Sequence, residues 1–180
     1  MDNFVNIYIY IYKMIENGDI EAVKLLDEEE LTYRDDVMNS LLHIAANNGK
    51  FEIVKILYDK GLSLYTCNEA GYLPIHSAAK NGYANIVEWF ISTDPDQINQ
   101  VSDSGYTPLH LAAKNSQIEV MKTLIINNAD YTISDNYYRS PIRLLLNEHP
   151  DYEQYIPQDN FFESLVSSEQ LLDFLGKISK

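Results

Sequence analysis

The sequence predicts an all-α solenoid, in which short antiparallel helix pairs stack in a row. Three observations support this fold class. A five-residue motif returns along the 180-residue chain at intervals of 33 and 34 residues. The apolar positions after each copy keep one register and have the spacing of a helix face. A single unit carries too little apolar surface to fold alone, so neighbouring units must cover each other.

The repeated motif is centred on a histidine. Leu42-His43-Ile44-Ala45-Ala46 returns in related form at 75–79 and 109–113, and a further copy at 142–146 has Arg143 in the histidine column. A turn position recurs at Gly18, Gly49, Gly82 and Ser116. An apolar column recurs at Leu26, Leu57, Phe90 and Leu124. Columns that hold register over four copies predict a helix–turn–helix repeat.

The copy at 102–134 indicates how one unit folds. Gly105 suits a turn, Thr107 can cap a helix with its hydroxyl, and Pro108 suits the first helical turn. Small residues at 112 and 113 let the next unit approach closely, and Asn115-Ser116 ends this helix. A second helix then carries an apolar stripe at Val120, Met121 and Leu124, which we expect to be buried together with Leu57 and Val87.

The motif resembles that of the ankyrin-repeat family. Thr107-Pro108-Leu109-His110-Leu111-Ala112-Ala113 matches the family's hallmark run without a mismatch, and degraded copies stand at 73–76 and 40–43. Departures such as Leu41, Ser116 and Arg143 fall in the outer copies, as is typical of capping repeats. The resemblance covers roughly residues 5–150 and implies a capping repeat at 1–34, repeats at 35–67, 68–101 and 102–134, and a degenerate repeat at 135–150. The repeat pattern is lost after Pro141, and residues 151–180 are expected to form a helical tail.

The two ends require separate predictions. In the first repeat we expect helices at about Ile9–Glu16 and Ile20–Glu28, although the alternation of Ile and Tyr taken alone favours a strand. The acidic run 27–30 is interpreted as solvated surface. The acidic, amphipathic tail should hold short helices at Asp159–Leu165 and Ser168–Ile178. This tail either caps the last repeat or docks a partner.

Composition excludes several classes of function. A net charge of −14 repels nucleic acid and anionic membranes. No apolar run reaches the roughly 18–20 residues of a membrane span. One cysteine, Cys67, excludes an internal disulfide framework and a cysteine-based zinc site. Without a basic leader or cleavage site, we expect a cytoplasmic protein, with delivery into another cell by a route without a cleavable leader left open.

Catalytic motifs are absent from the sequence. It contains no phosphate-binding glycine loop, no nucleophile elbow and no His-Glu-x-x-His zinc motif. The resemblance implies that His43, His76 and His110 bond to a nearby Thr and to loop backbone, tying one unit to the next. His149 fits no pattern. The sequence therefore predicts no catalytic, cofactor or metal site.

The resemblance also implies where a partner binds. The turns between units project as fingers, and together with the first helices they line a concave groove. Tyr72 and Tyr106 share one column, so they are either neighbouring contact residues or ordinary half-buried turn residues. The candidate partner-binding residues are Asp36, Asn39, Asn47, Glu69, Tyr72, Lys80, Asp103, Tyr106, Lys114, Tyr137 and Arg139.

These observations favour a non-enzymatic protein–protein interaction module. The acidic charge favours a protein partner with a basic patch, bound by a monomer of this chain. A stoichiometric inhibitor that resembles an antitoxin, a bacterial effector and an adaptor are all compatible with the pattern. The alternatives are a small enzyme whose activity lies in the tail or in a recruited partner, and a fragment of a larger scaffold.

Overall fold

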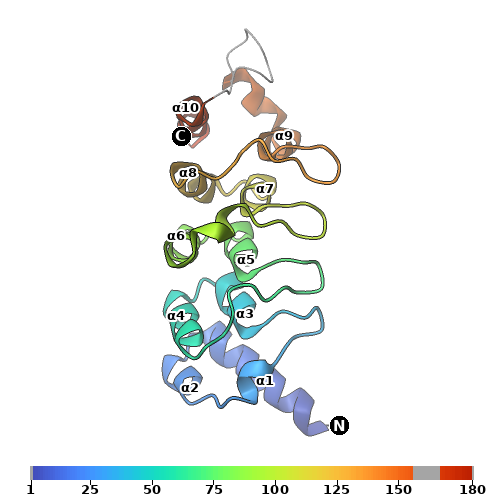
Figure 1. Cartoon of the computed structure of the whole chain (residues 1–180), viewed down its shortest axis with the longest axis vertical. Coiled ribbons are helices and arrows are strands. Elements are labelled where there is room, and N and C mark those ends of the chain that lie inside the picture. The colour runs from blue at the N-terminus through green and yellow to red at the C-terminus, as the bar shows by residue number, and fades with distance from the viewer. Residues whose placement is uncertain (1, 156–166, 180) are drawn as a thin grey trace.

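The computed structural model describes residues 2–155 and 167–179, with side chains from Ile7 onward. Its helices stand in two rows, and loops project to one side (Figure 1). The inner row comprises α1 (Asp2–Asn17), α3 (Leu41–Asn47), α5 (Pro74–Lys80), α7 (Pro108–Lys114) and α9 (Pro141–Glu148). The outer row comprises α2 (Ile20–Lys24), α4 (Phe51–Asp59), α6 (Ala84–Thr93), α8 (Ile118–Ile126) and α10 (Ser168–Ile178).

Short 3-10 helices lie in the connections: η1 (Glu30–Thr32), η2 (Pro95–Asn99) and η3 (Pro150–Tyr155). The part of the chain that the structure describes holds no strand, apart from one isolated bridge between Arg34 and Ser40. The predicted all-α solenoid is therefore confirmed.

The inner helices begin and end in similar ways. The Thr107 hydroxyl accepts a hydrogen bond from the His110 backbone N–H at 3.3 Å, and Pro108 follows it. Ser40 and Ser140 cap α3 and α9 in the same way. After α7, Asn115 caps the helix and Ser116 takes a left-handed backbone (φ 55°), in the column where Gly49 and Gly82 also have positive φ. The predicted helix signals of the unit at 102–134 are confirmed.

The core lies between the rows and runs the length of the stack. Leu57, Val87 and Leu124 are fully buried, as the apolar columns predict. The alanine pairs of α3, α5 and α7 are fully buried as well, because their small side chains let consecutive inner helices pack closely. Each unit contacts mainly its neighbours, so the fold is stabilised by nearest-neighbour interfaces.

The first repeat differs from its predicted boundaries. Helix α1 begins at Asp2, seven residues before the predicted start, because the Ile-Tyr run is helical: Ile11 and Ile15 are buried, and Tyr8 packs against the core on the same face. Helix α2 ends at Lys24, four residues before the predicted end.

The acidic run explains the early end of α2. Asp27 Oδ1 accepts a hydrogen bond from the Glu30 N–H at 2.8 Å, and Glu30 Oε2 accepts one from the Asp27 N–H at 3.0 Å. This reciprocal capping starts η1 where the sequence predicted continued helix. Asp27 and Glu29 are exposed, so the run is surface that also shapes the connection.

The end of the stack is covered by α10. Its Leu171, Phe174 and Leu175 are buried, and the helix packs against α8 and η3. The helix has its predicted bounds, but its cap is Ser167, one residue before the predicted start. The helix predicted at Asp159–Leu165 lies outside the described residues.

His149 has partners that the sequence did not suggest. Its ring stacks on Tyr152 with centroids 4.6 Å apart, and its Nε2 lies 2.5 Å from the Ser116 hydroxyl. The contact with Ser116 joins the end of α9 to the turn that follows α7.

Candidate protein-binding surface

Four turns, which we call the fingers, project from the inner helices at 35–39, 68–72, 102–106 and 135–139. The first side chain of each finger folds its turn. Asp35 Oδ1 accepts hydrogen bonds from the backbone N–H groups of Val37 (3.1 Å) and Asn39 (2.7 Å). Side-chain oxygens of Asn68 and Asp135 accept the equivalent two bonds in the second and fourth fingers, and Ser102 Oγ accepts one bond, from the Tyr106 N–H, in the third. These polar residues therefore fold the turns and are not free for a partner.

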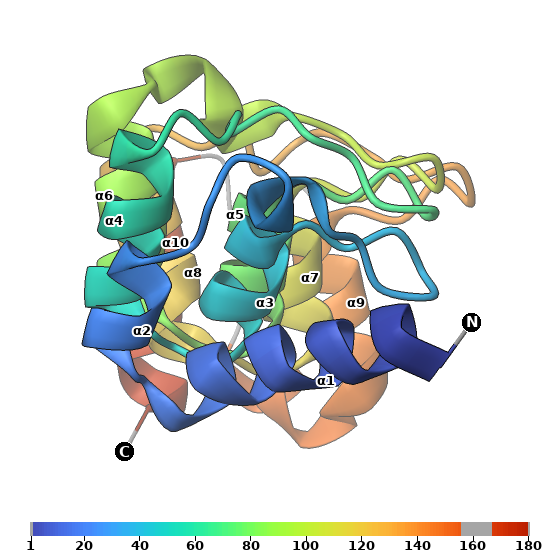
Figure 2. The ribbon, with the colours of Figure 1, turned by 90° about the horizontal axis from the view of Figure 1, so that it is seen from below.

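Neighbouring fingers are hydrogen-bonded to one another. Backbone N–H groups at the tips donate to carbonyl oxygens one finger back, from Glu69 to Val37 (3.0 Å), from Asp103 to Ala70 (3.3 Å) and from Asn136 to Ser104 (3.1 Å). In Figure 2 the fingers lie over one another on one side of the helices. The fingers thus form one continuous wall, whose shape is set before any partner arrives.

The repeated histidines fasten this wall to the helices. His43 Nδ1 accepts from the Ser40 backbone N–H at 3.1 Å, so its Nε2 carries the proton and donates to the Tyr72 carbonyl oxygen at 2.7 Å. His76 and His110 make the same pair of bonds, to the Tyr106 and Arg139 carbonyl oxygens. Each histidine joins its own helix to the next finger.

Burial keeps these rings neutral. It lowers the pKa of His43 and of His76 to about 4, although the carbonyl oxygens that accept from the rings (Tyr72 for His43, Tyr106 and Gln100 for His76) act in the opposite direction. The pKa of His110 is lowered by burial as well. The histidines thus have the linking role that the family resemblance implied, and they are spread along the stack instead of converging on one site.

Tyr72 and Tyr106, which share one column, are more buried than we expect of residues that contact a partner. Tyr106 exposes only 7% of its surface and packs with Leu111 and Leu144 in a small apolar cluster. Tyr72 is half-buried and stacks on the His76 ring, with centroids 5.6 Å apart. Of the two alternatives that the sequence left open, Tyr106 therefore fits a packed turn residue better than a contact residue, because its ring fills the space between finger and helix.

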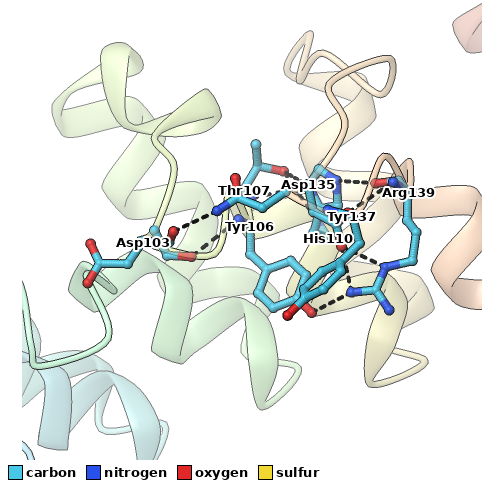
Figure 3. A network of polar contacts seen from close by, with 9 residues as sticks. Asp103, Tyr106, Thr107, His110, Asp135, Tyr137 and Arg139 are labelled. Atoms are coloured by element: carbon cyan, nitrogen blue, oxygen red, sulfur yellow. Dashed lines mark hydrogen bonds and ion pairs between the residues drawn. The ribbon is translucent and has the colours of Figure 1, made fainter.

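The fourth finger carries a network of charged and aromatic groups, shown in Figure 3. Arg139 pairs with the fully buried carboxylate of Asp135 at 2.7 Å and donates to the Tyr106 hydroxyl at 2.9 Å. Its guanidinium also lies over the Tyr137 ring, 4.9 Å from the centroid. On the helix side, the Lys114 ammonium lies 5.2 Å from the centre of the Tyr106 ring. Tyr137 itself points outward, and 71% of it is exposed.

The remaining predicted residues give the surface two edges of opposite charge. Asp36, Glu69 and Asp103 are exposed at the tips of three successive fingers. Asn47, Lys80 and Lys114 are exposed along the other edge, at the last turns of α3, α5 and α7. Asn39 is half-buried and donates to Asp35 at 2.7 Å, so it braces the first finger.

Sequence reasoning missed two exposed finger residues. Met38 is 52% exposed and Tyr138 is 91% exposed, and both have positive φ in the column that Gly71 and Gly105 occupy in the middle fingers. The sequence signal that could have identified both residues is a large side chain in a column that holds glycine in the middle fingers. Such a residue must point away from the turn, into solvent.

Among the described residues, no group of three or more His, Cys, Asp or Glu side chains is placed to hold a metal ion. No helix in that part of the chain is both long and apolar enough to cross a membrane. The only cysteine in the sequence, Cys67, is exposed and unbonded to another sulfur.

The stacked helix pairs, the wall of fingers and the histidine links define a repeat protein of the solenoid class. The family model of ankyrin repeats in three copies matches residues 11–99 and 42–135, which together exceed half of the chain. The chain belongs to the ankyrin-repeat family, as its sequence motif predicts, and such repeats are typical of protein–protein interaction modules.

Two curated relatives carry the same name. The chain is 31% identical over 86 residues to protein phosphatase 1 regulatory subunit 27 of Mus musculus, which covers 46% of this chain and 56% of the relative. It is 38% identical over 56 residues to protein phosphatase 1 regulatory subunit 27 of Homo sapiens, which covers 31% of this chain and 36% of the relative. The chain therefore matches about half of one relative and about a third of the other.

Proposed function

We propose that this chain is a non-enzymatic module that binds a protein partner through the fingers and the adjacent ends of α5 and α7. The observation that carries the proposal is the hydrogen-bonded wall of fingers, which presents Asp36, Glu69 and Asp103 in one row. Because this surface is ordered before binding, a partner loses little affinity to its rearrangement.

The charges favour a partner with a basic patch. Three exposed carboxylates at the finger tips add to a net charge of −14, which attracts a basic surface over several ångströms. Lys80 and Lys114 face the other edge and would orient the partner, since a basic group placed there is repelled. We propose that one copy of the chain, acting as a monomer, engages one such partner in the cytoplasm.

The test reverses charge at the finger tips. We expect a variant with Glu69→Lys and Asp103→Lys to lose its basic partner, because both positions are exposed and their side chains make no bonds that hold the fold. The matched control is Asp59→Lys with Glu88→Lys, which makes the same change in charge at exposed positions of the outer helices α4 and α6.

Affinity capture with quantitative mass spectrometry would compare wild type, finger variant and control. A protein retained by wild type and control but lost by the finger variant supports the proposal. A captured set that is equal for all three folded proteins contradicts the surface that we propose.

A second candidate is more specific: the chain regulates a partner enzyme by binding to it. The observation that favours it is the similarity to two regulatory subunits of protein phosphatase 1. Titration of the chain into the purified catalytic subunit, with activity and affinity measured together, tests this role. An inhibitor lowers the activity at one equivalent, whereas an adaptor or effector leaves it unchanged while still binding. Absence of binding rules out this enzyme as the partner.

A further inference from the structure

A cavity of about 410 Å³ lies away from the finger tips, between two loops. One loop leads from α2 to the first finger and supplies Glu28, Thr32 and Arg34. The other leads from α4 to the second finger and supplies Lys60, Ser63 and Thr66. In Figure 2 these connections pass over the ends of the inner helices on their way to the fingers. Charged and hydroxyl side chains from two repeats therefore meet in one hollow.

Neither of the two cations in this cavity forms a direct ion pair. Ion pairs in the described part of the chain involve Lys24, Lys55, Lys122, Arg139 and Lys177, and neither Arg34 nor Lys60 takes part in one. Arg34 donates to the Tyr33 carbonyl oxygen at 3.3 Å, and Lys60 donates to the Leu26 carbonyl oxygen at 2.9 Å. These bonds orient the two groups but leave their full charges in place.

Both cations are half-buried, in contrast to the exposed Lys80 and Lys114. The chain has 27 acidic and 13 basic residues, and in its described part no carboxylate lies within ion-pair distance of Arg34 or Lys60. A hollow with low-dielectric walls concentrates the field of such charges. An anion that enters the hollow would be attracted by both groups. It would also take the place of the water that partial burial removes from them.

The hydroxyl groups add directed donors. Ser63 Oγ accepts from the Tyr65 backbone N–H at 3.2 Å, so its own proton remains to donate. Thr66 Oγ1 donates to the Ser63 carbonyl oxygen at 3.2 Å, which holds the loop in shape. A planar guanidinium, a compact ammonium and a hydroxyl together match the several oxygens of a tetrahedral dianion better than the two oxygens of a carboxylate.

We propose that the cavity lined by Arg34, Lys60 and Ser63 binds a phosphoryl group, as free phosphate or as a phosphate monoester on a partner's serine. Arg34 contacts two oxygens, Lys60 supplies the second positive charge, and Ser63 donates to a remaining oxygen. Glu28 lines the same cavity and is exposed, so its carboxylate weakens binding without preventing it. This site is separate from the finger surface, and its test does not depend on the proposed function.

The experiment titrates the full chain at constant ionic strength with inorganic phosphate, O-phosphoserine and acetate, followed by amide chemical shifts. We expect saturable binding of phosphate and O-phosphoserine, with shifts centred on 28–34 and 60–66, and binding of acetate at least about tenfold weaker. Tighter binding of O-phosphoserine than of phosphate identifies a modified protein side chain as the source. Equal or weaker binding identifies free phosphate.

Variants connect the signal to these residues. Arg34→Gln and Lys60→Gln should each weaken phosphate binding about tenfold or more. Glu28→Gln should tighten it, and Lys80→Gln, which removes a lysine outside the cavity, should leave it unchanged. Lys60→Arg keeps the charge and should retain most of the affinity, which distinguishes loss of charge from loss of fold.

The proposal is wrong if phosphate shows no saturation, or if folded Arg34→Gln and Lys60→Gln bind it as well as wild type. It is equally contradicted if Lys80→Gln weakens binding as much as Lys60→Gln, because the effect would then reflect net charge alone.

Discussion

His76 Nε2 lies 3.0 Å from the Tyr106 carbonyl oxygen, 30 residues further along the chain. This bond joins the start of one inner helix to the finger of the next repeat, and His43 makes the corresponding bond to Tyr72. The same contacts therefore stabilise the stack and fix the shape of the binding surface. Conditions that break them should affect stability and partner binding together.

The first prediction concerns pH. The pKa of His43 and His76 is about 4 in the folded chain, against an ordinary value of 6.5, because burial disfavours the charged ring. The unfolded chain therefore binds more protons between these values, and the free energy of unfolding falls as pH falls from about 6.5 to about 4. Each histidine should contribute a loss on the order of 3 kcal/mol over that range. Urea denaturation at several pH values measures it.

A matched variant isolates this effect from titrating carboxylates. His76→Gln should be less stable than wild type at neutral pH, because the bond to Tyr106 is lost, but its stability should fall less on acidification. The difference between the two curves gives the histidine contribution. Parallel curves for the two proteins would contradict a neutral, buried role for His76.

The sequence predicts the fold well because repetition supplies many independent signals. The His, Ala and Leu columns agree over several copies, so the inner helices and the core are recovered. The first repeat is less well predicted because Asp27 and Glu30 cap each other and end the helical pattern early, which is a local contact without a column.

The sequence predicts which residues lie on the fingers, but it does not predict how exposed each of them is. Columns place Glu69, Asp103 and Tyr106 on fingers, and the acidic pair is exposed as expected. Burial of Tyr106 depends on Leu111 and Leu144 from two different helices, which spacing along one chain cannot reveal. The cavity at Arg34 and Lys60 was missed for the same reason, because its loops come from different repeats.

The second prediction concerns backbone strain in the fourth finger. Tyr138 has φ of 60° and is 91% exposed, so its side chain contributes little packing energy to offset the unfavourable backbone conformation. Tyr138→Gly should stabilise the chain by about 0.5–1 kcal/mol, since the lower strain exceeds the extra entropy of glycine in the unfolded state. Thermal or urea denaturation provides the measurement, and a lower midpoint would count against this account.

Gly71 occupies the same column as Tyr138, and we expect a substitution there to lower the stability of the chain instead of raising it. Its φ is 73°, and a Cβ there would lie 2.7 Å from the Asp103 backbone nitrogen of the next finger. Gly71→Ala should therefore cost about 2 kcal/mol or more, because strain and a backbone clash add. It should also weaken partner binding at the fingers. A neutral effect on stability would indicate that neighbouring fingers separate easily.

The next prediction compares the middle of the stack with its end. Leu124 in α8 and Leu175 in α10 are both fully buried. Leu124→Ala should cost about 2–5 kcal/mol, because a cavity forms between repeats that depend on each other. Leu175→Ala removes the same atoms from the capping helix, which has neighbours on one side only. It should therefore disturb the coupling between repeats less. Equal, small losses for both variants in urea would contradict nearest-neighbour stabilisation.

The last prediction separates two roles of Asp135. Its Oδ1 accepts from the backbone N–H groups of Tyr137 and Arg139 at 2.9 Å each, while its Oδ2 pairs with the Arg139 guanidinium. Asp135→Asn should keep the turn, since Asn68 folds the second finger in the same way, and should remove only the ion pair. Because the carboxylate is buried and Arg139 is partly exposed, that loss should be about 1–2 kcal/mol, between the values for exposed ion pairs and for buried charged hydrogen bonds.

Asp135→Ala removes both roles and leaves two backbone N–H groups without their acceptor, so it should cost about 3 kcal/mol. Only the alanine variant should release Tyr137 from its outward position, with a loss of partner affinity. Urea denaturation and amide exchange of residues 135–139 measure the two effects. If the asparagine variant is as unstable as the alanine variant, the ion pair and not the turn holds the fourth finger in place.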